Sequence, residues 1–254
     1  MDQPSKPTPE IASSEINLGH TFSAALAVLL AGLAVLWWAT HGGQGFTTEA
    51  LRRQQIEQHP QLIAPFALTT SGGKNTQLST QRSTQRNTHL STLLAADKKV
   101  WLVDFVYTRC QTVCSALGSV YQQLQAQIEA RGLEKTVGLL SISFDPANDD
   151  ATRLADYATR MQMNPAVWQI ATLSDWQDRR RLLDEFGIMV IPAPLGEFEH
   201  NAALHLVNSQ GVLVKIMDYL DYATALDVAV AVSQGQPSAL AVSLKQPVKQ
   251  PAAP

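Results

Sequence analysis

The chain has 254 residues, of which 45% are hydrophobic and 16% charged, and its formal net charge is −3. This length suits one domain of ordinary size with additional segments, and the apolar content is normal for a globular protein. The slightly negative balance provides no basic field that would favour nucleic acid. Two cysteines are too few for a disulfide framework, so the class of small disulfide-rich proteins is excluded.

A long apolar segment stands near the beginning of the chain. Residues 21–40 read TFSAALAVLLAGLAVLWWAT, without a charge, and Trp37 and Trp38 lie at one end. This is about the 20 residues that a helix needs to cross a bilayer, with an aromatic pair where the interface would be. We predict an uncleaved transmembrane anchor preceded by a disordered tail, residues 1–20. A cleaved signal peptide is the alternative, but it would have a shorter apolar core and a more basic start.

The charges that flank this segment give a small signal about its orientation. Lys6 precedes it, whereas Arg52 and Arg53 follow it. Taken alone, the positive-inside rule therefore favours a cytoplasmic location for the C-terminal part.

Beyond the anchor, the composition predicts a linker at 41–61, partly helical, a folded domain at 62–233 and a disordered tail at 234–254. Within the domain, strand patterns alternate with helical ones. We expect strands at 99–107, 136–144 and 167–174, and helices from Cys110 to Gly132 and at 150–161, 175–186 and 222–233. Residues 203–208 and 212–217 are expected to form a hairpin. A smaller hairpin is expected at 65–79, with its turn at Gly72 and Gly73, followed by a polar loop at 80–88. Asn148 or Asp149 is expected to cap the second helix and Ser174 the third.

This order predicts an α/β fold with a mixed, mostly parallel sheet covered by helices on both faces, to which the C-terminal hairpin adds an antiparallel edge. A strand, cysteines at the start of a helix, further strand–helix units, a hairpin and a last helix is the order of a thioredoxin-like domain.

Both cysteines lie in VDFVYTRCQTVCSALG, residues 103–118, where a strand is expected to end and a helix to begin. A disulfide between Cys110 and Cys114 would close a very short loop and stabilise the fold little. Positions i and i+4 share a helix face, and both the helix N-terminus and Arg109 favour thiolates. The pair therefore suits disulfide exchange or binding of a soft metal, with two inert buried cysteines as the alternative.

A metal would need a third ligand. Of six histidines, four lie outside the expected helices and strands of the domain: His20, His41, His59 and His89. In a thioredoxin-like order, the loop before the penultimate strand faces the start of the cysteine-bearing helix, so His200 is the predicted ligand. His205, in mid-strand, is expected to be a packed residue. Two thiolates and an imidazole suit Cu(I) and also hold Cu(II), whereas a structural zinc site normally has four protein ligands.

The sequence resembles the SCO/SenC family of membrane-anchored copper proteins. The resemblance lies in DFVYTRCQTVC, SISFDP, VWQIATLSD and EHNAALHLVNSQG, and it covers roughly residues 62–232. Gln111 and Ser115 follow the two cysteines, where the family often has proline.

The resemblance implies a thioredoxin-like domain that faces the periplasm and is held in the inner membrane by a single span. It also implies copper bound by Cys110, Cys114 and His200, and a part in assembling the dinuclear copper centre of cytochrome c oxidase. The expected partner is the copper-bearing subunit of that oxidase or another periplasmic copper or thiol protein.

Two functions stay open. The first is a copper-binding assembly factor, which need not be an enzyme. The second is a thiol–disulfide oxidoreductase in which Cys110 and Cys114 form the redox pair and reduce partner cysteines. A peroxidase using Thr108 and Arg109 is a weaker alternative. Asp145, before a proline, is expected to start a turn.

Overall fold

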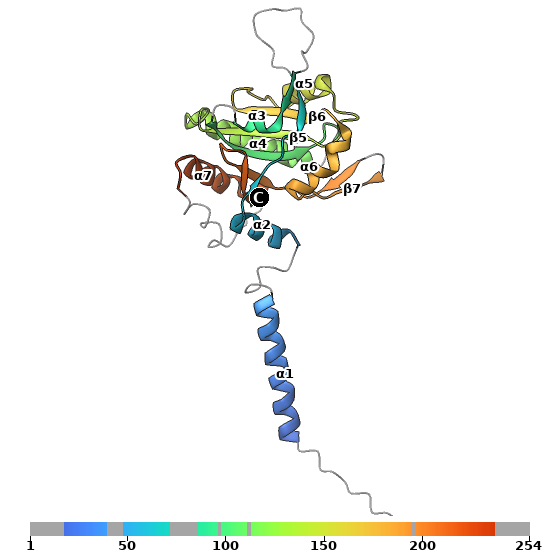
Figure 1. The fold of residues 1–254 in the computed structure, drawn as a ribbon, viewed down its shortest axis with the longest axis vertical. Coiled ribbons are helices and arrows are strands. Elements are labelled where there is room, and N and C mark those ends of the chain that lie inside the picture. Colours follow the sequence, from blue (N-terminus) through green and yellow to red (C-terminus); the bar gives the residue numbers. More distant parts are fainter. Residues whose placement is uncertain are drawn as a thin grey trace, which may run out of the picture. The chain divides into compact units, whose positions relative to one another are not determined.

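The structure, a computed structural model, describes residues 18–39, 48–71, 86–95, 98–110, 113–194 and 197–236 (Figure 1). The chain divides into two compact units, Met1–Leu51 and Arg52–Pro254. The predicted tails and the turn at Gly72 and Gly73 fall largely or wholly outside the described residues.

The first unit contains helix α1 (Leu18–Ala39), whose described side chains are all exposed. Across the part of the chain that the structure describes, no helix is both long enough and apolar enough to cross a membrane.

The second unit is built on an eight-stranded sheet with the order β1-β10-β9-β4-β5-β6-β2-β3. Its strands are β1 (Gln61–Leu62), β2 (Ala67–Thr70), β3 (Arg86–His89), β4 (Val100–Val106), β5 (Val137–Ser143), β6 (Trp168–Leu173), β9 (Leu204–Val207) and β10 (Val212–Met217). Only β4, β5 and β6 pair in parallel, and every other neighbour pairs antiparallel. The mostly parallel sheet that we predicted is therefore limited to the centre, because hairpins rather than crossover helices supply the flanking strands.

Helices cover both faces of this sheet (Figure 1). The helices are α2 (Thr48–Gln58), α3 (Leu90–Ala95), α4 (Val113–Ala130), α5 (Ala151–Arg160), α6 (Arg179–Phe186) and α7 (Tyr222–Ser233), with short 3₁₀ turns η2 (Trp176–Asp178) and η4 (Tyr219–Asp221). One core cluster joins residues of α5 and α6 to the sheet, and a second joins residues of α4 and α7 to it. All residues of β4 and β5 are buried, as their mostly apolar runs predict, and these include the polar residues Asp104, Ser141 and Ser143.

Several predicted elements agree with the structure. The apolar stripe of α4 is buried at Leu117, Tyr121, Leu124 and Ile128, and the last three belong to the core cluster that α4 shares with the sheet. Gly187 ends α6 in a left-handed conformation, with φ 68°, which glycine adopts without steric cost. The hairpin of β9 and β10 is confirmed.

Two predicted caps are wrong. Asp150 caps α5, since its carboxylate accepts the backbone N–H groups of Thr152 and Arg153 at 3.0 and 2.9 Å. Asp175 caps η2, and Ser174 instead contacts Thr69 through the two hydroxyls. Neighbouring residues able to cap a helix compete at such positions, and the tertiary contacts decide which one does so.

The N-terminal hairpin also differs from the prediction. β2 pairs with β3, which includes the end of the polar run that we expected to be a loop. Main-chain pairing with β2 makes this polar segment a strand, because it lies at the edge of the sheet and needs no second apolar face.

The predicted linker contributes to the folded unit. In α2, Ile56 is buried in the core, and Glu57 forms an ion pair with the buried Lys215. The guanidinium of Arg52 donates to the carbonyl oxygen of Glu185 at 2.5 Å. The second unit therefore begins within the segment predicted as linker.

Candidate metal centre

Cys110 stands just beyond the central strand β4. Its backbone N–H donates to the carbonyl oxygen of Tyr107 at 3.1 Å, which makes a turn directly after the strand. The side chain is half-buried and packs against the apolar core. Cys110 is not helical, and α4 begins at Val113, so our prediction that both cysteines share one helix face is wrong. Cys114 is the second residue of α4, and its side chain lies outside the described part.

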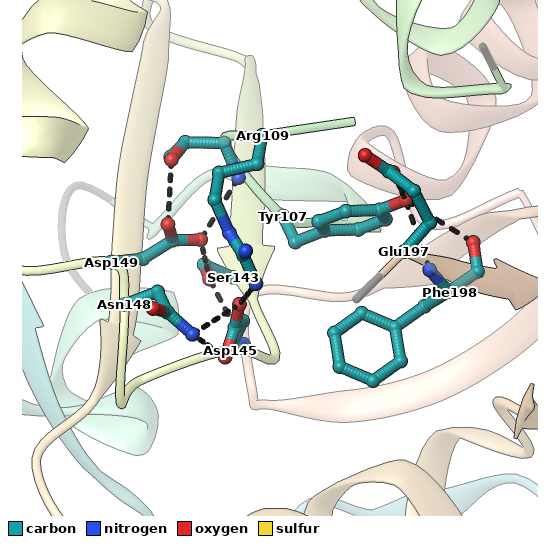
Figure 2. Close-up of polar contacts among 9 residues, drawn as sticks. Tyr107, Arg109, Ser143, Asp145, Asn148, Asp149, Glu197 and Phe198 are labelled. Atoms are coloured by element: carbon teal, nitrogen blue, oxygen red, sulfur yellow. Dashed lines mark hydrogen bonds and ion pairs between the residues drawn. The ribbon is translucent and has the colours of Figure 1, made fainter. Parts of the chain in front are cut away.

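A buried carboxylate holds the segment before Cys110. Asp149 follows β5 and is completely buried. It accepts hydrogen bonds from the backbone N–H of Thr108 at 2.9 Å, from the Thr108 hydroxyl at 2.5 Å and from the Ser143 hydroxyl at 2.5 Å (Figure 2). These contacts connect the end of β4 to the end of β5. They also replace the hydrogen bonds to water that the carboxylate loses when it is buried.

A second contact joins the same two chain segments. The Arg109 guanidinium lies 2.9 Å from Asp145, whose carboxylate also accepts the side-chain amide of Asn148 at 3.0 Å (Figure 2). The hydrogen bond to Asp145 raises the pKa of Arg109 above its ordinary value. The Asp145 carbonyl accepts the N–H groups of Asn148 and Asp149, so the predicted turn is present. The Arg109 guanidinium, which we expected to favour a thiolate at Cys110, forms an ion pair with the carboxylate of Asp145 in this turn.

His200 lies at the end of a short strand, not in the loop that we predicted. It belongs to β8 (Phe198–His200), which pairs with β7 (Val190–Pro192) in a separate two-stranded sheet. Its Nδ1 lies 3.1 Å from the Asn201 carbonyl oxygen. Because a carbonyl only accepts, Nδ1 carries the proton and the neutral ring has its lone pair on Nε2, an atom that can bind a metal.

His200 and Cys110 are electrostatic neighbours, and both contact Tyr107. Burial lowers the pKa of His200, while the Asn201 carbonyl and the nearby Cys110 act in the opposite direction. The ring is 5.2 Å from that of Phe144 and 6.4 Å from that of Tyr107, measured between centroids. A half-buried, neutral imidazole near a thiol is an arrangement that suits a borderline-soft cation.

His205 has a different environment. It is completely buried in β9, with Nδ1 3.2 Å from the Val103 carbonyl oxygen and Nε2 3.1 Å from that of Phe186. Burial lowers the pKa of His205 to about 4. The prediction that His205 is a packed residue is confirmed.

Two residues of the site were missed by sequence reasoning. The Tyr107 hydroxyl lies 2.5 Å from the Glu197 carboxylate. Burial, the hydrogen bond to Glu197 and the neighbouring Cys110 raise the pKa of Tyr107. One signal was present in the sequence: Tyr107 carries a hydroxyl and stands at the end of the mostly apolar run 99–107. Nothing there pointed to Glu197, 90 residues away.

Among the described side chains, no group of three or more histidine, cysteine, aspartate or glutamate residues is placed to hold a metal. The Cys114 side chain does not belong to that set, so the described part of the predicted trio is Cys110 and His200.

This arrangement defines a class of protein. Three parallel central strands, helices on both faces and a cysteine between a central strand and the following helix characterise a thioredoxin-like domain. The model of the SCO1/SenC family matches residues 55–232. The chain belongs to this family.

Individual relatives agree with the assignment. The SCO1 protein homolog of Bacillus subtilis is 25% identical over 194 residues, which span 74% of this chain and 84% of that protein.

Solved structures share the fold. BsSco, described as a member of the Sco family of cytochrome c oxidase assembly proteins, has a TM-score of 0.55 at 22% identity, covering 69% of this chain and 95% of that one. A SCO1/SenC family lipoprotein from Bacillus anthracis has a TM-score of 0.53 at 21% identity, with 66% and 96% covered. Arabidopsis thaliana ScoI, crystallised with copper bound, has a TM-score of 0.51 at 16% identity, with 68% and 99% covered.

Proposed function

We propose that this protein binds copper through Cys110, Cys114 and His200, and that it helps to deliver copper to, or to mature, the dinuclear copper centre of cytochrome c oxidase. The observation that carries the proposal is that Cys110 and His200, both half-buried, contact the same residue, Tyr107. Cys110 does so through a backbone hydrogen bond of 3.1 Å, and His200 through a ring contact of 6.4 Å between centroids. Membership of the SCO1/SenC family supports it, as do the copper bound by the Arabidopsis relative and the assembly role named for BsSco.

The chemistry of the donors supports this choice of metal. Thiolate and imidazole are the soft and borderline ligands that copper prefers in both of its common oxidation states. Each ligand must lose its proton before it binds. Burial favours the neutral form of His200, so little free energy is needed to deprotonate this ligand at neutral pH.

The test is copper binding by the full-length chain in detergent. We expect His200→Ala to weaken Cu(II) binding at least about tenfold, which is about 1.4 kcal/mol, and to change the visible and EPR spectra. Cys110→Ser and Cys114→Ser should each weaken and shift the sulfur-to-copper absorption, and the double variant should remove it. His89→Ala, which alters an exposed histidine on β3, is the matched control. The proposal fails if His200→Ala binds copper with the affinity and spectra of the wild type.

The alternative function is a thiol–disulfide oxidoreductase that reduces partner cysteines. It is favoured by the position of Cys110, a half-buried thiol just before the N-terminus of α4, where a thiolate is stabilised. A redox titration of the Cys110–Cys114 pair tests it. A potential too low to be cycled by periplasmic thiol partners would exclude this activity.

We further propose that residues 21–40 anchor the protein in the inner membrane as a single span, with the domain in the periplasm. The support is the charge-free sequence of that segment together with the family. The small charge difference across it favours the opposite orientation, but it depends on one or two residues. A protease added to intact spheroplasts should degrade the domain, and full protection would contradict this orientation.

The proposed partner is the copper-bearing oxidase subunit or another periplasmic copper or thiol protein, which cross-linking at Cys110 would capture.

A further inference from the structure

His200 belongs to a hairpin that is not part of the main sheet. Within the described residues, β7 and β8 pair only with each other, and neither joins the eight-stranded ladder that contains β4. No strand pairing between β8 and β4 fixes the placement of His200 relative to Cys110. Side-chain contacts of the hairpin therefore contribute to it, in addition to the chain connection to β9 and the Asn201 side chain, which bonds to Met189 and Gly187.

One hydroxyl supplies such contacts from the β4 side. The Tyr107 hydroxyl lies 2.5 Å from Glu197 Oε2 and 3.2 Å from the Phe198 carbonyl oxygen, and it accepts the Phe198 backbone N–H at 3.1 Å (Figure 2). A phenol has a single proton, and the closer, charged carboxylate is the better acceptor for it. The hydroxyl therefore holds β8 through a donated bond to Glu197 and an accepted bond from Phe198.

The same residue also holds Cys110. The Tyr107 carbonyl accepts the Cys110 N–H at 3.1 Å, and the Cys110 side chain is an electrostatic neighbour of the Tyr107 hydroxyl. The Tyr107 ring packs between the hairpin and the strands, with centroids 5.3 Å from Phe198 and 5.4 Å from Phe144. Tyr107 thus contacts both halves of the site.

We propose that Tyr107 is a positioning residue that sets the placement of His200 relative to Cys110, with Glu197 as the anchor of its hydroxyl. The hydroxyl fixes the residue two positions before His200, so its loss lets the end of β8 move away from Cys110. The effect on copper rests on the proposed function, but the placement of His200 does not, and it can be measured without metal.

The test variant is Tyr107→Phe in the full-length chain, which removes the hydroxyl and retains the ring. Tyr222→Phe is the matched control, because its hydroxyl makes one exposed hydrogen bond, to Gln123, on α4. In copper-free protein we expect the Phe198 amide to exchange with solvent at least about tenfold faster, as it loses its acceptor. We also expect the NMR signals of the His200 ring to shift. The control should show neither change.

A double-mutant cycle with copper then tests the consequence. Tyr107→Phe should weaken Cu(II) binding about tenfold and alter its EPR spectrum, and should add nothing in a His200→Ala background. The positioning role is overturned if the His200 ring signals in copper-free Tyr107→Phe match the wild type, even where the Phe198 amide exchanges faster. A wild-type protein that binds no copper would count against the proposed function alone, since the metal-free result still decides the role of Tyr107.

Discussion

His200 and His205 stand five positions apart, yet the structure gives them opposite environments. His200 ends the β7–β8 hairpin, is half-buried and has Cys110 as an electrostatic neighbour. His205 is sealed inside the main sheet between two carbonyl oxygens. The strand in the main sheet makes His205 a core residue, whereas the strand outside it leaves His200 only half-buried.

The largest expected effect is on stability. We predict that His205→Ala lowers the free energy of unfolding by about 3 kcal/mol, because it removes a ring packed on Phe105 and Phe186 and leaves one buried carbonyl without its donor. His200→Ala should lower it by less than about 1 kcal/mol. Urea unfolding measures both, and similar losses for the two variants would break the comparison.

The low pKa of the buried His205 should also make the free energy of unfolding depend on pH. Unfolded His205 takes up a proton near its ordinary pKa of 6.5, whereas the folded residue does so only near 4. The free energy of unfolding should therefore fall as pH drops from 6.5 to 4, by up to about 3 kcal/mol.

A buried aspartate opposes this effect. Burial raises the pKa of Asp104 to about 7, so its contribution to stability increases as pH falls from 7 to 4. The acid dependence of His205 is best measured in an Asp104→Asn background, where adding His205→Gln should flatten the curve. A slope that persists in the double variant would assign it to other groups.

A smaller effect is expected at the Cys110 side of the site. Asp149→Asn should cost about 2 kcal/mol, because an amide cannot accept all three hydrogen bonds that reach the carboxylate. The Thr108 amide should exchange faster, while the Phe198 amide stays protected, if separate contacts hold the two sides. Asp150→Asn is the control, since asparagine caps a helix equally well. Equal loosening at Thr108 and Phe198 would show that the two sides form one unit.

The smallest effect is expected for the Arg109–Asp145 pair. Arg109 keeps 37% of its side chain exposed, so solvent screens the interaction. Asp145→Asn should change the free energy of unfolding by less than about 1 kcal/mol, with the difference shrinking in high salt. Urea curves at two salt concentrations measure it, and a loss above about 2 kcal/mol would give this pair a structural weight comparable to that of Asp149.

Much of the fold could be predicted from local sequence. β4 and β5 are mostly apolar runs, the buried stripe of α4 repeats at helical spacing, and Gly187 and Gly211 mark turns that need a positive φ. Each of these signals depends on residues close together in the chain. The same holds for the segments around Cys110 and His200 that carried the family resemblance.

The tertiary structure alone decided the arrangement around the site. β8 is a strand only because β7 pairs with it, and β3 only because β2 does. Tyr107 meets Glu197 across 90 positions and Thr108 meets Asp149 across 41. Such contacts leave no local period or spacing in the sequence, because they arise when distant segments are packed against the same end of β4. The sequence by itself indicated Cys110, Cys114 and His200 as candidate metal ligands, and the packing decided how Cys110 and His200 are each held by contacts with Tyr107.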